Sequence, residues 1–151
     1  MLFADTLKAK LTECMKAKQD IPKNLLRVIL GDVASEEARK RRPATDDEVV
    51  AVVKKLIKNN RISCRELEAH GRKDDPMMRV LCEELDFLYQ IMPNKPLMQD
   101  GILNQLYEVA DAIKKASNEG SALGMAMKYL KEQKCEVLSD DVKEVVVLLR
   151  K

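Results

Sequence analysis

Several residue types on which many fold classes depend are scarce in this chain of 151 residues. It has no Trp, only 3% aromatic residues, five Gly and five Pro. A β-sandwich or barrel needs frequent turns and strands rich in β-branched or aromatic side chains, so both architectures are disfavoured. Hydrophobic residues make up 46% of the chain and charged residues 34%, which is typical of a folded globular protein. The composition therefore predicts an all-α fold with an aliphatic and Met-rich core.

Residues that build catalytic centres and metal sites are scarce as well. His70 is the only histidine, whereas catalytic triads and most zinc sites combine a histidine with other groups. The four cysteines are far apart in sequence and form no C-x-x-C pair, so we expect reduced thiols. Neither a P-loop nor a dinucleotide-binding glycine motif is present. The sequence therefore predicts no catalytic residue, no metal and no cofactor.

Long hydrophobic runs are also missing. The longest runs, Val49–Val53 and Val145–Leu149, have five residues each, whereas a membrane span needs about 20. The amino-terminal residues lack the basic region and long apolar run of a secretory signal. We therefore expect no membrane association and a cytoplasmic location, with the mitochondrial matrix as an alternative.

Three groups of acidic residues are candidates for general acid–base catalysis or Mg²⁺ binding. We interpret them as helix starts instead. Thr45–Glu48 has the form of a capping box, and Asp74–Pro76 places a cap residue before a proline. Ser139–Asp141 has the same cap-then-acid pattern, and Ser121 is a further candidate cap.

Hydrophobic periodicity and helix-breaking residues divide the chain into expected helices. These cover about 2–18, 22–42, 45–70, 76–89 and 100–116, with two more starting at 121 and 139. In the long third helix, one face is broadly followed by Val49, Val53, Leu56, Asn60 and Leu67. Two prolines at 93 and 96 mark a linker, because proline cannot continue a helix. We predict an N-terminal helical bundle over residues 1–92 and a three-helix domain over residues 93–151.

Positive charge concentrates in one part of the chain, although the net charge is only +2. Residues 39–73 hold eleven Lys or Arg against five Asp or Glu. Six of these basic residues are candidates for contacts with nucleic-acid phosphates: Lys54, Lys58, Arg61, Arg65, Arg72 and Lys73. The first four are spaced by four, three and four residues, so they form one stripe along the predicted helix. No aromatic residue interleaves them, so base stacking is not expected, and a merely solvated helix face is the alternative.

Two further candidates for RNA binding, Gly124 and Lys128, lie in the second half of the chain. The segment Gly120–Gly124 has glycines at both ends and opens a predicted helix. Backbone N–H groups at such a helix start attract phosphate groups. The sequence therefore predicts a second anion-binding surface there.

The order of several short motifs resembles the GatB/YqeY family. Thr45–Val49 is similar to the T-D-E-E-V start of the family's long helix, and Arg61–Asp74 to its R-x-S…A-x-G-R-x-D segment. Leu88–Leu97 resembles the Y-L-P-x-x-L linker, and Leu123–Met127 resembles the M-G-K-V-M sequence of the tail. Two features depart from the pattern: Met125 stands where the family usually has Lys, and residues 134–138 lack its glycine- and lysine-rich loop.

The resemblance implies a small helical bundle followed by a three-helix tail domain. The same tail closes the B subunit of glutamine-dependent tRNA amidotransferase, a carbon–nitrogen ligase that uses glutamine as amido donor, and there it helps to hold tRNA. The family attributes amidation to larger domains than these. We therefore expect an accessory module that binds tRNA, or a tRNA-processing or amidotransferase complex. The alternatives are a helical protein-interaction module with no nucleic-acid role and a self-sufficient enzyme.

Overall fold

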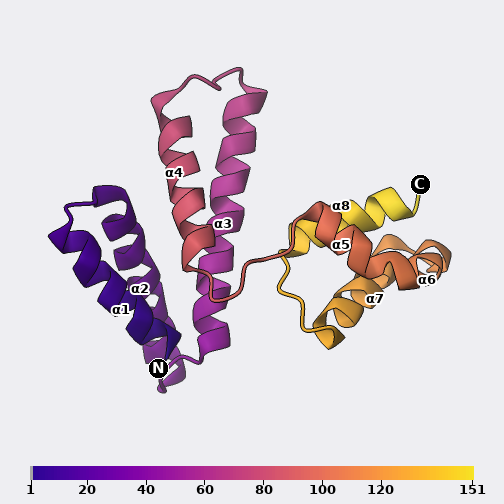
Figure 1. The fold of residues 1–151 in the computed structure, drawn as a ribbon, viewed down its shortest axis with the longest axis horizontal. Helices are drawn as coiled ribbons and strands as arrows, with labels where there is room; N and C mark the ends of the chain where they lie inside the picture. Colours follow the sequence, from indigo (N-terminus) through magenta and orange to yellow (C-terminus); the bar gives the residue numbers. More distant parts are fainter. Residues whose placement is uncertain (1) are drawn as a thin grey trace. The chain divides into compact units, whose positions relative to one another are not determined.

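Helices are the only regular secondary structure in the computed structural model, which describes residues 2–151 (Figure 1). The expected all-α class is therefore confirmed. The elements are α1 (Phe3–Lys16), α2 (Asp20–Lys40), α3 (Asp46–Ala69), α4 (Pro76–Ile91), α5 (Gln99–Leu106), the 3₁₀ helix η1 (Tyr107–Val109), α6 (Ala110–Lys115), α7 (Glu119–Glu132) and α8 (Ser139–Leu149). Contacts between residues divide the chain into two compact units, the first ending at Pro93 and the second covering Asn94–Lys151.

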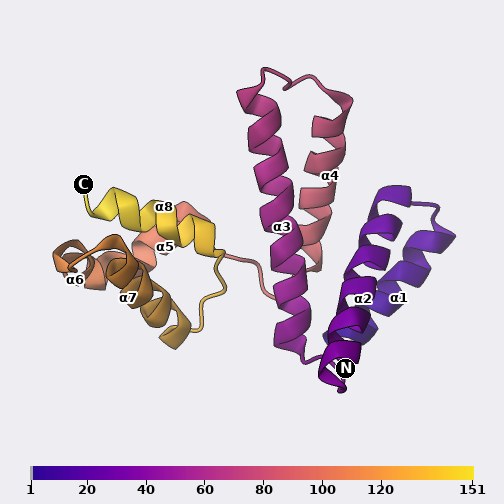
Figure 2. The ribbon, with the colours of Figure 1, turned by 180° about the vertical axis from the view of Figure 1, so that it is seen from behind.

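The first unit consists of two helical hairpins. Helices α1 and α2 form one hairpin and α3 and α4 the other, as both ribbon views show (Figures 1 and 2). Helix α2 also packs against α3 and α4, so the hairpins share one core. The fully buried large side chains of this core are Leu7, Leu26, Ile29, Val49, Val53, Ile57 and Leu88.

The buried face of α3 differs from the expected one. Val49 and Val53 are buried as expected, but the next core residue is Ile57, which has no exposed surface, whereas Leu56 is half-buried. The buried face extends to Ile57 because α3 packs against α1, α2 and α4, which requires a broader apolar face than one partner does. Asn60 is half-buried, and its amide donates a hydrogen bond of 2.7 Å to the carboxylate of Glu84 on α4.

The ends of α3 and the start of α4 lie where the capping residues and the glycine in the sequence predict them. Thr45 and Glu48 form the capping box: the Thr45 hydroxyl accepts a hydrogen bond from the Glu48 amide at 3.2 Å, and Glu48 accepts one from the Thr45 amide. Asp75 caps α4 by accepting from the Met77 amide at 2.8 Å. Gly71 follows α3 with φ of +69°, a conformation that glycine adopts without strain.

Replacing Thr45 with alanine is expected to lower the free energy of unfolding of the first unit by about 1 kcal/mol, because the Glu48 amide loses its acceptor. The denaturation midpoint in urea measures this change. Thr45→Ser keeps a hydroxyl at the same position and serves as the control. Equal midpoints for the wild type and Thr45→Ala would show that the cap contributes nothing to stability.

An acceptor from α3 also caps the start of α1. The backbone N–H of Phe3 donates to the carboxylate of Asp46 at 2.9 Å, across 43 residues of sequence. The first N–H groups of a helix have no partner within the helix, so this bond satisfies one of them. One member of the acidic run at 46–48 thus caps a helix other than its own.

The second unit has its own core, formed from all of its α-helices. Its fully buried residues are Ile102, Leu106, Ile113, Ala122, Ala126, Leu130, Val142, Val145 and Val146. The single helix expected over 100–116 is wrong, because η1 separates α5 from α6. Val109 has φ of −108° and ψ of 9°, which interrupts the helix between the buried residues Leu106 and Ile113.

Two helix starts of the second unit also differ from expectation. The cap of α7 is Asn118, whose side-chain oxygen accepts from the Ser121 amide at 2.8 Å, so Ser121 lies inside the helix. Helix α8 begins at Ser139 without any side-chain cap, because the cap position holds Leu138. Leu138 is buried, as is Asp141 in the first turn. Helix α8 therefore starts beside a buried apolar residue and not at a polar side-chain cap.

Arg150 connects the end of the chain with α6. Its guanidinium donates to the backbone oxygens of Ile113, at 2.8 Å, and Ala116, at 3.0 Å. Helix α6 has only six residues and ends at Lys115, so these carbonyls lie at its C-terminal end. Carbonyls there lack intrahelical partners, and a cation is favoured beside them.

Candidate nucleic-acid interface

The four residues of the predicted basic stripe all lie on α3, which runs without interruption over 24 residues. Their exposure is unequal, because Lys58 and Arg65 are exposed whereas Lys54 and Arg61 are half-buried. Lys54, Arg61 and Arg65 each already have an interaction partner. Lys58 and Arg65 are seven residues apart, which corresponds to about 10 Å along a helix. The structure thus supports a shorter exposed row than the spacing alone predicts.

The stripe continues into the turn between α3 and α4, where Arg72 and Lys73 are exposed. The guanidinium of Arg72 forms an ion pair with Asp75, the cap residue of α4. The hydrogen bond from the Met77 amide, followed by the one from Arg72, holds the pKa of Asp75 below its usual value. Arg72 therefore helps to hold the start of α4, and Lys73 is the better candidate for a ligand contact.

Gly124 and Lys128 lie four residues apart on α7 and are both exposed. A methyl group added at Gly124 would meet no atom within 4 Å. The backbone there is open to close approach by a ligand, although Gly124 lies inside α7 and not at its first turn. These residues belong to the second unit, so they form a separate candidate surface from the stripe.

The structure assigns structural roles to three of the other sequence candidates. His70 is exposed and ends α3 as its C-cap. Asp46 and Asp75 cap helices. Within residues 2–151, no group of three or more His, Cys, Asp and Glu residues is placed to hold a metal ion. None of the helices in that range combines the length and the apolar character needed to cross a bilayer.

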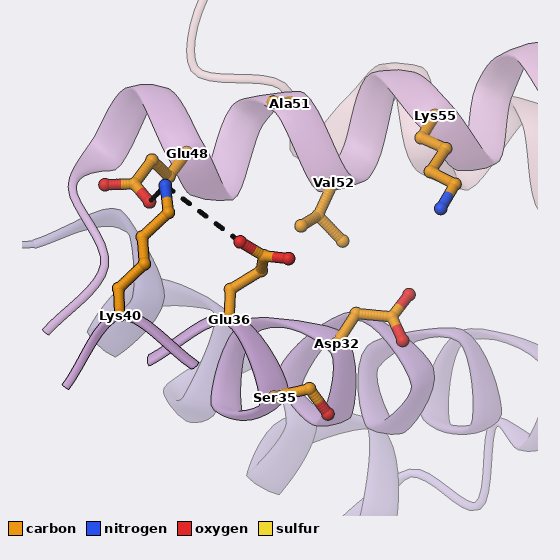
Figure 3. A pocket seen from close by; sticks show the side chains of 8 residues that line it. All are labelled: Asp32, Ser35, Glu36, Lys40, Glu48, Ala51, Val52 and Lys55. Atoms are coloured by element: carbon orange, nitrogen blue, oxygen red, sulfur yellow. Dashed lines mark hydrogen bonds and ion pairs between the residues drawn. The ribbon is translucent and has the colours of Figure 1, made fainter. Parts of the chain in front are cut away.

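A charged groove between α2 and α3 was not anticipated from the sequence. It has a volume of about 360 Å³ and is lined by Asp32, Ser35, Glu36, Lys40, Glu48, Ala51, Val52 and Lys55 (Figure 3). Lys40 reaches from α2 to the Glu48 carboxylate at 2.6 Å, and Arg42 donates to the same carboxylate at 2.7 Å. Arg39 pairs with Glu36 at 2.7 Å. Much of the positive charge of residues 39–42 is therefore balanced within the unit.

Stability of the first unit is expected to fall in acid as Glu48 becomes protonated. Hydrogen bonds from Lys40 and then Arg42 lower the pKa of Glu48 from 4.5 to about 2. A group with a depressed pKa in the folded state stabilises above its unfolded value, so this contribution is lost as pH falls from about 4.5 towards 2. We expect the difference in urea midpoint between pH 7 and pH 3 to be smaller in Glu48→Gln than in the wild type.

The control for this experiment is Glu66→Gln, which removes an exposed carboxylate of the same helix outside the cluster. It is expected to keep the wild-type difference between the two pH values. Glu36 and Asp75, whose pKa values are also lowered by hydrogen bonds to basic side chains or backbone, leave some acid sensitivity in every variant. An undiminished pH dependence in Glu48→Gln would contradict the assigned role of the cluster.

Comparison with known proteins identifies the family. The family model described as "Yqey-like protein" matches residues 4–149. The chain belongs to the YqeY-like protein family. A search of curated proteins finds no match. The resemblance to YqeY is thereby confirmed over essentially the whole chain, while the relation to tRNA amidotransferase stays a prediction.

The structure also shows how this YqeY-like chain forms the loop that departs from the family pattern. Lys134 has φ of +57°, in the left-handed region that glycine adopts most readily. The Cys135 amide donates to Leu130 at 3.0 Å and closes the end of α7. Met125, which replaces the expected lysine, is 41% exposed on α7. These positions of the tail therefore carry fewer cations than the resemblance implies.

Proposed function

We propose that this YqeY-like chain is an accessory module that binds tRNA weakly and has no catalysis of its own. The observation that carries the proposal is the row of Lys58 and Arg65, exposed along α3 and followed by the exposed Lys73. Membership of the YqeY-like family supports it, because the resemblance links that family to the tRNA-binding tail of the amidotransferase. A carbon–nitrogen ligase with glutamine as donor would then be a partner and not an activity of this chain.

The number of exposed charges sets the expected affinity. Two or three phosphate contacts give a slope of log affinity against log salt concentration of roughly −2 to −3. Such a slope corresponds to modest affinity, so specificity has to come from elsewhere, either from Gly124 and Lys128 on α7 or from a partner in a tRNA-processing complex.

We propose the cytoplasm or the mitochondrial matrix as the compartment, since tRNA is used in both.

The test is a tRNA-binding titration across a salt series with the wild type and Lys58→Glu/Arg65→Glu. Arg61 is left unchanged, because it is half-buried whereas Arg65 is exposed. We expect the double variant to bind at least about tenfold more weakly at low salt, because two attractions become repulsions. The matched control is Lys8→Glu/Lys143→Glu, which makes the same change in net charge at exposed positions on α1 and α8.

The control distinguishes a binding face from general charge attraction. Equal losses in the two double variants, or no wild-type binding at low salt, would contradict tRNA binding by α3. The stripe would then be a solvated helix face.

A helical protein-interaction module is the second candidate, and one observation favours it. Large apolar side chains of the second unit are exposed: Met98, Leu103, Tyr107, Met125 and Leu148. Tyr107 is 82% exposed, which is unusual for an aromatic side chain. Such a module has no nucleic-acid role, so it predicts no tRNA binding even at low salt, whereas phosphate contacts predict tRNA binding that weakens strongly as salt rises.

A further inference from the structure

Two cysteines that are eighteen residues apart in sequence meet across the α3–α4 hairpin. Cys64 lies on α3 and Cys82 on α4, and the two helices run side by side (Figure 1). Because α3 and α4 pack together, burial and, after it, the nearby Cys82 thiol raise the pKa of the Cys64 thiol, and both cysteines are free. One turn away, the hydrogen bond between Asn60 and Glu84 also joins the two helices and fixes their register.

We propose that Cys64 and Cys82 form an oxidative modification site, in which a hydroperoxide converts the two thiols into a reversible disulfide between α3 and α4. The site uses neither the basic residues of the stripe nor an RNA ligand, so it is independent of the proposed function. A metal ion is not the expected occupant, because no group of three or more potential ligands is present within residues 2–151.

The chemistry proceeds in two steps that balance. The Cys82 thiolate attacks the peroxide, the O–O bond breaks, and a sulfenic acid forms while the alkoxide takes up a proton to leave as an alcohol. The Cys64 sulfur then attacks the sulfenic sulfur, forms the S–S bond and releases the oxygen as water. Two thiols lose two electrons and two protons, and the hydroperoxide is reduced to an alcohol and water.

Exposure determines the order of these steps. Cys82 is exposed, whereas Cys64 is half-buried, so the peroxide reaches Cys82 first. Burial, followed by the neighbouring Cys82 and Glu68, raises the pKa of the Cys64 thiol and lowers its share of thiolate. Cys64 is therefore suited to resolve the sulfenic acid of its neighbour and less suited to react with peroxide itself.

A disulfide here would close a ring that contains the end of α3, the turn with Gly71 and the start of α4. Closing a ring of this size restricts the unfolded chain and stabilises the folded hairpin. The oxidised first unit is therefore expected to melt at least about 5 °C above the reduced one. Reduction with a dithiol should reverse the shift.

The experiment treats the full chain with hydrogen peroxide, blocks the remaining thiols and maps disulfides by mass spectrometry. We expect the pair Cys64–Cys82, reversed by a dithiol reductant, as the main product. In Cys64→Ser, Cys82 should accumulate as a sulfenic acid that dimedone traps. In Cys82→Ser, Cys64 should stay largely reduced.

Cys135→Ser is the control, because Cys135 lies in the second unit and its loss should not change the product. The proposal would be overturned if Cys82 is oxidised beyond sulfenic acid while Cys64 stays reduced. It would also be overturned if Cys64 pairs with Cys14 or Cys135, or if the melting temperature is unchanged by formation of the pair.

Discussion

Replacing Ile57 with alanine is expected to destabilise the first unit by about 2–5 kcal/mol and to leave the second unit unchanged. Ile57 has no exposed surface and lies in the middle of α3, between the partner helices of that unit. Truncating it removes buried methyl groups and leaves a cavity that a packed core closes only in part. The core cluster of the second unit, by contrast, is built only from residues between Leu97 and Leu149.

Hydrogen exchange followed by mass spectrometry measures this effect separately for peptides of each unit. We expect faster exchange in α1 to α4 and unchanged exchange in α5 to α8. Ile57→Val is a graded control with an expected cost of about 1 kcal/mol. Leu130→Ala is the reciprocal variant, because Leu130 is fully buried in the second core. A loss of protection in both units from either variant would show that they unfold together and that the linker at Pro93 is no folding boundary.

Arg150→Ala is expected to destabilise the second unit by about 2–3 kcal/mol. Hydrogen bonds to a charged donor contribute about 1.5–3 kcal/mol, and Arg150 donates to both Ile113 and Ala116 from a partly buried position. The short helix α6 contains only six residues, so it depends on such outside contacts more than a long helix does.

Urea denaturation gives the loss of stability, and exchange of peptides covering 110–116 shows where it arises. Arg150→Lys keeps the charge and is expected to recover part of the loss. Lys151→Ala removes the exposed neighbouring cation and should change nothing. Normal protection of α6 in Arg150→Ala would contradict the role assigned to these two hydrogen bonds.

The features predicted correctly from the sequence are those that local chemistry decides. Thr45 and Glu48 cap α3, Asp75 caps α4 and Gly71 follows α3 because the groups involved are within four residues of each other. A hydroxyl, a carboxylate or a positive φ is sufficient at such positions. The family membership was also recognisable, since short motifs of this kind recur in a fixed order.

The features that were missed depend on residues distant in sequence. No glycine or proline marks the break at η1, which lies between two residues buried in one core, Leu106 and Ile113. The sequence predicted Ser139 as the cap of α8, but the cap position holds the buried residue Leu138. Local patterns do not contain such packing information.

The candidate site likewise has features that local spacing predicts and features that only packing between helices decides. Spacing correctly placed Lys58 and Arg65 on one helix, because a continuous helix fixes the angle between them. It could not show that Lys54 and Arg61 are half-buried, since this depends on the packing of α3. The meeting of Cys64 and Cys82 requires the register of α3 against α4, which no spacing within one segment predicts.

The hydrogen bond between Phe3 and Asp46 has a consequence for biosynthesis. Helix α1 leaves the ribosome before α3, so the acceptor for its first amide is made 43 residues later. At about 5–20 residues per second, this delay is roughly 2–9 s. During that time the start of α1 lacks this cap, and Phe3 and Leu7 lack the contacts that bury them in the folded unit. Completion of α1 therefore has to follow synthesis of the start of α3, although α1 precedes α3 in the chain.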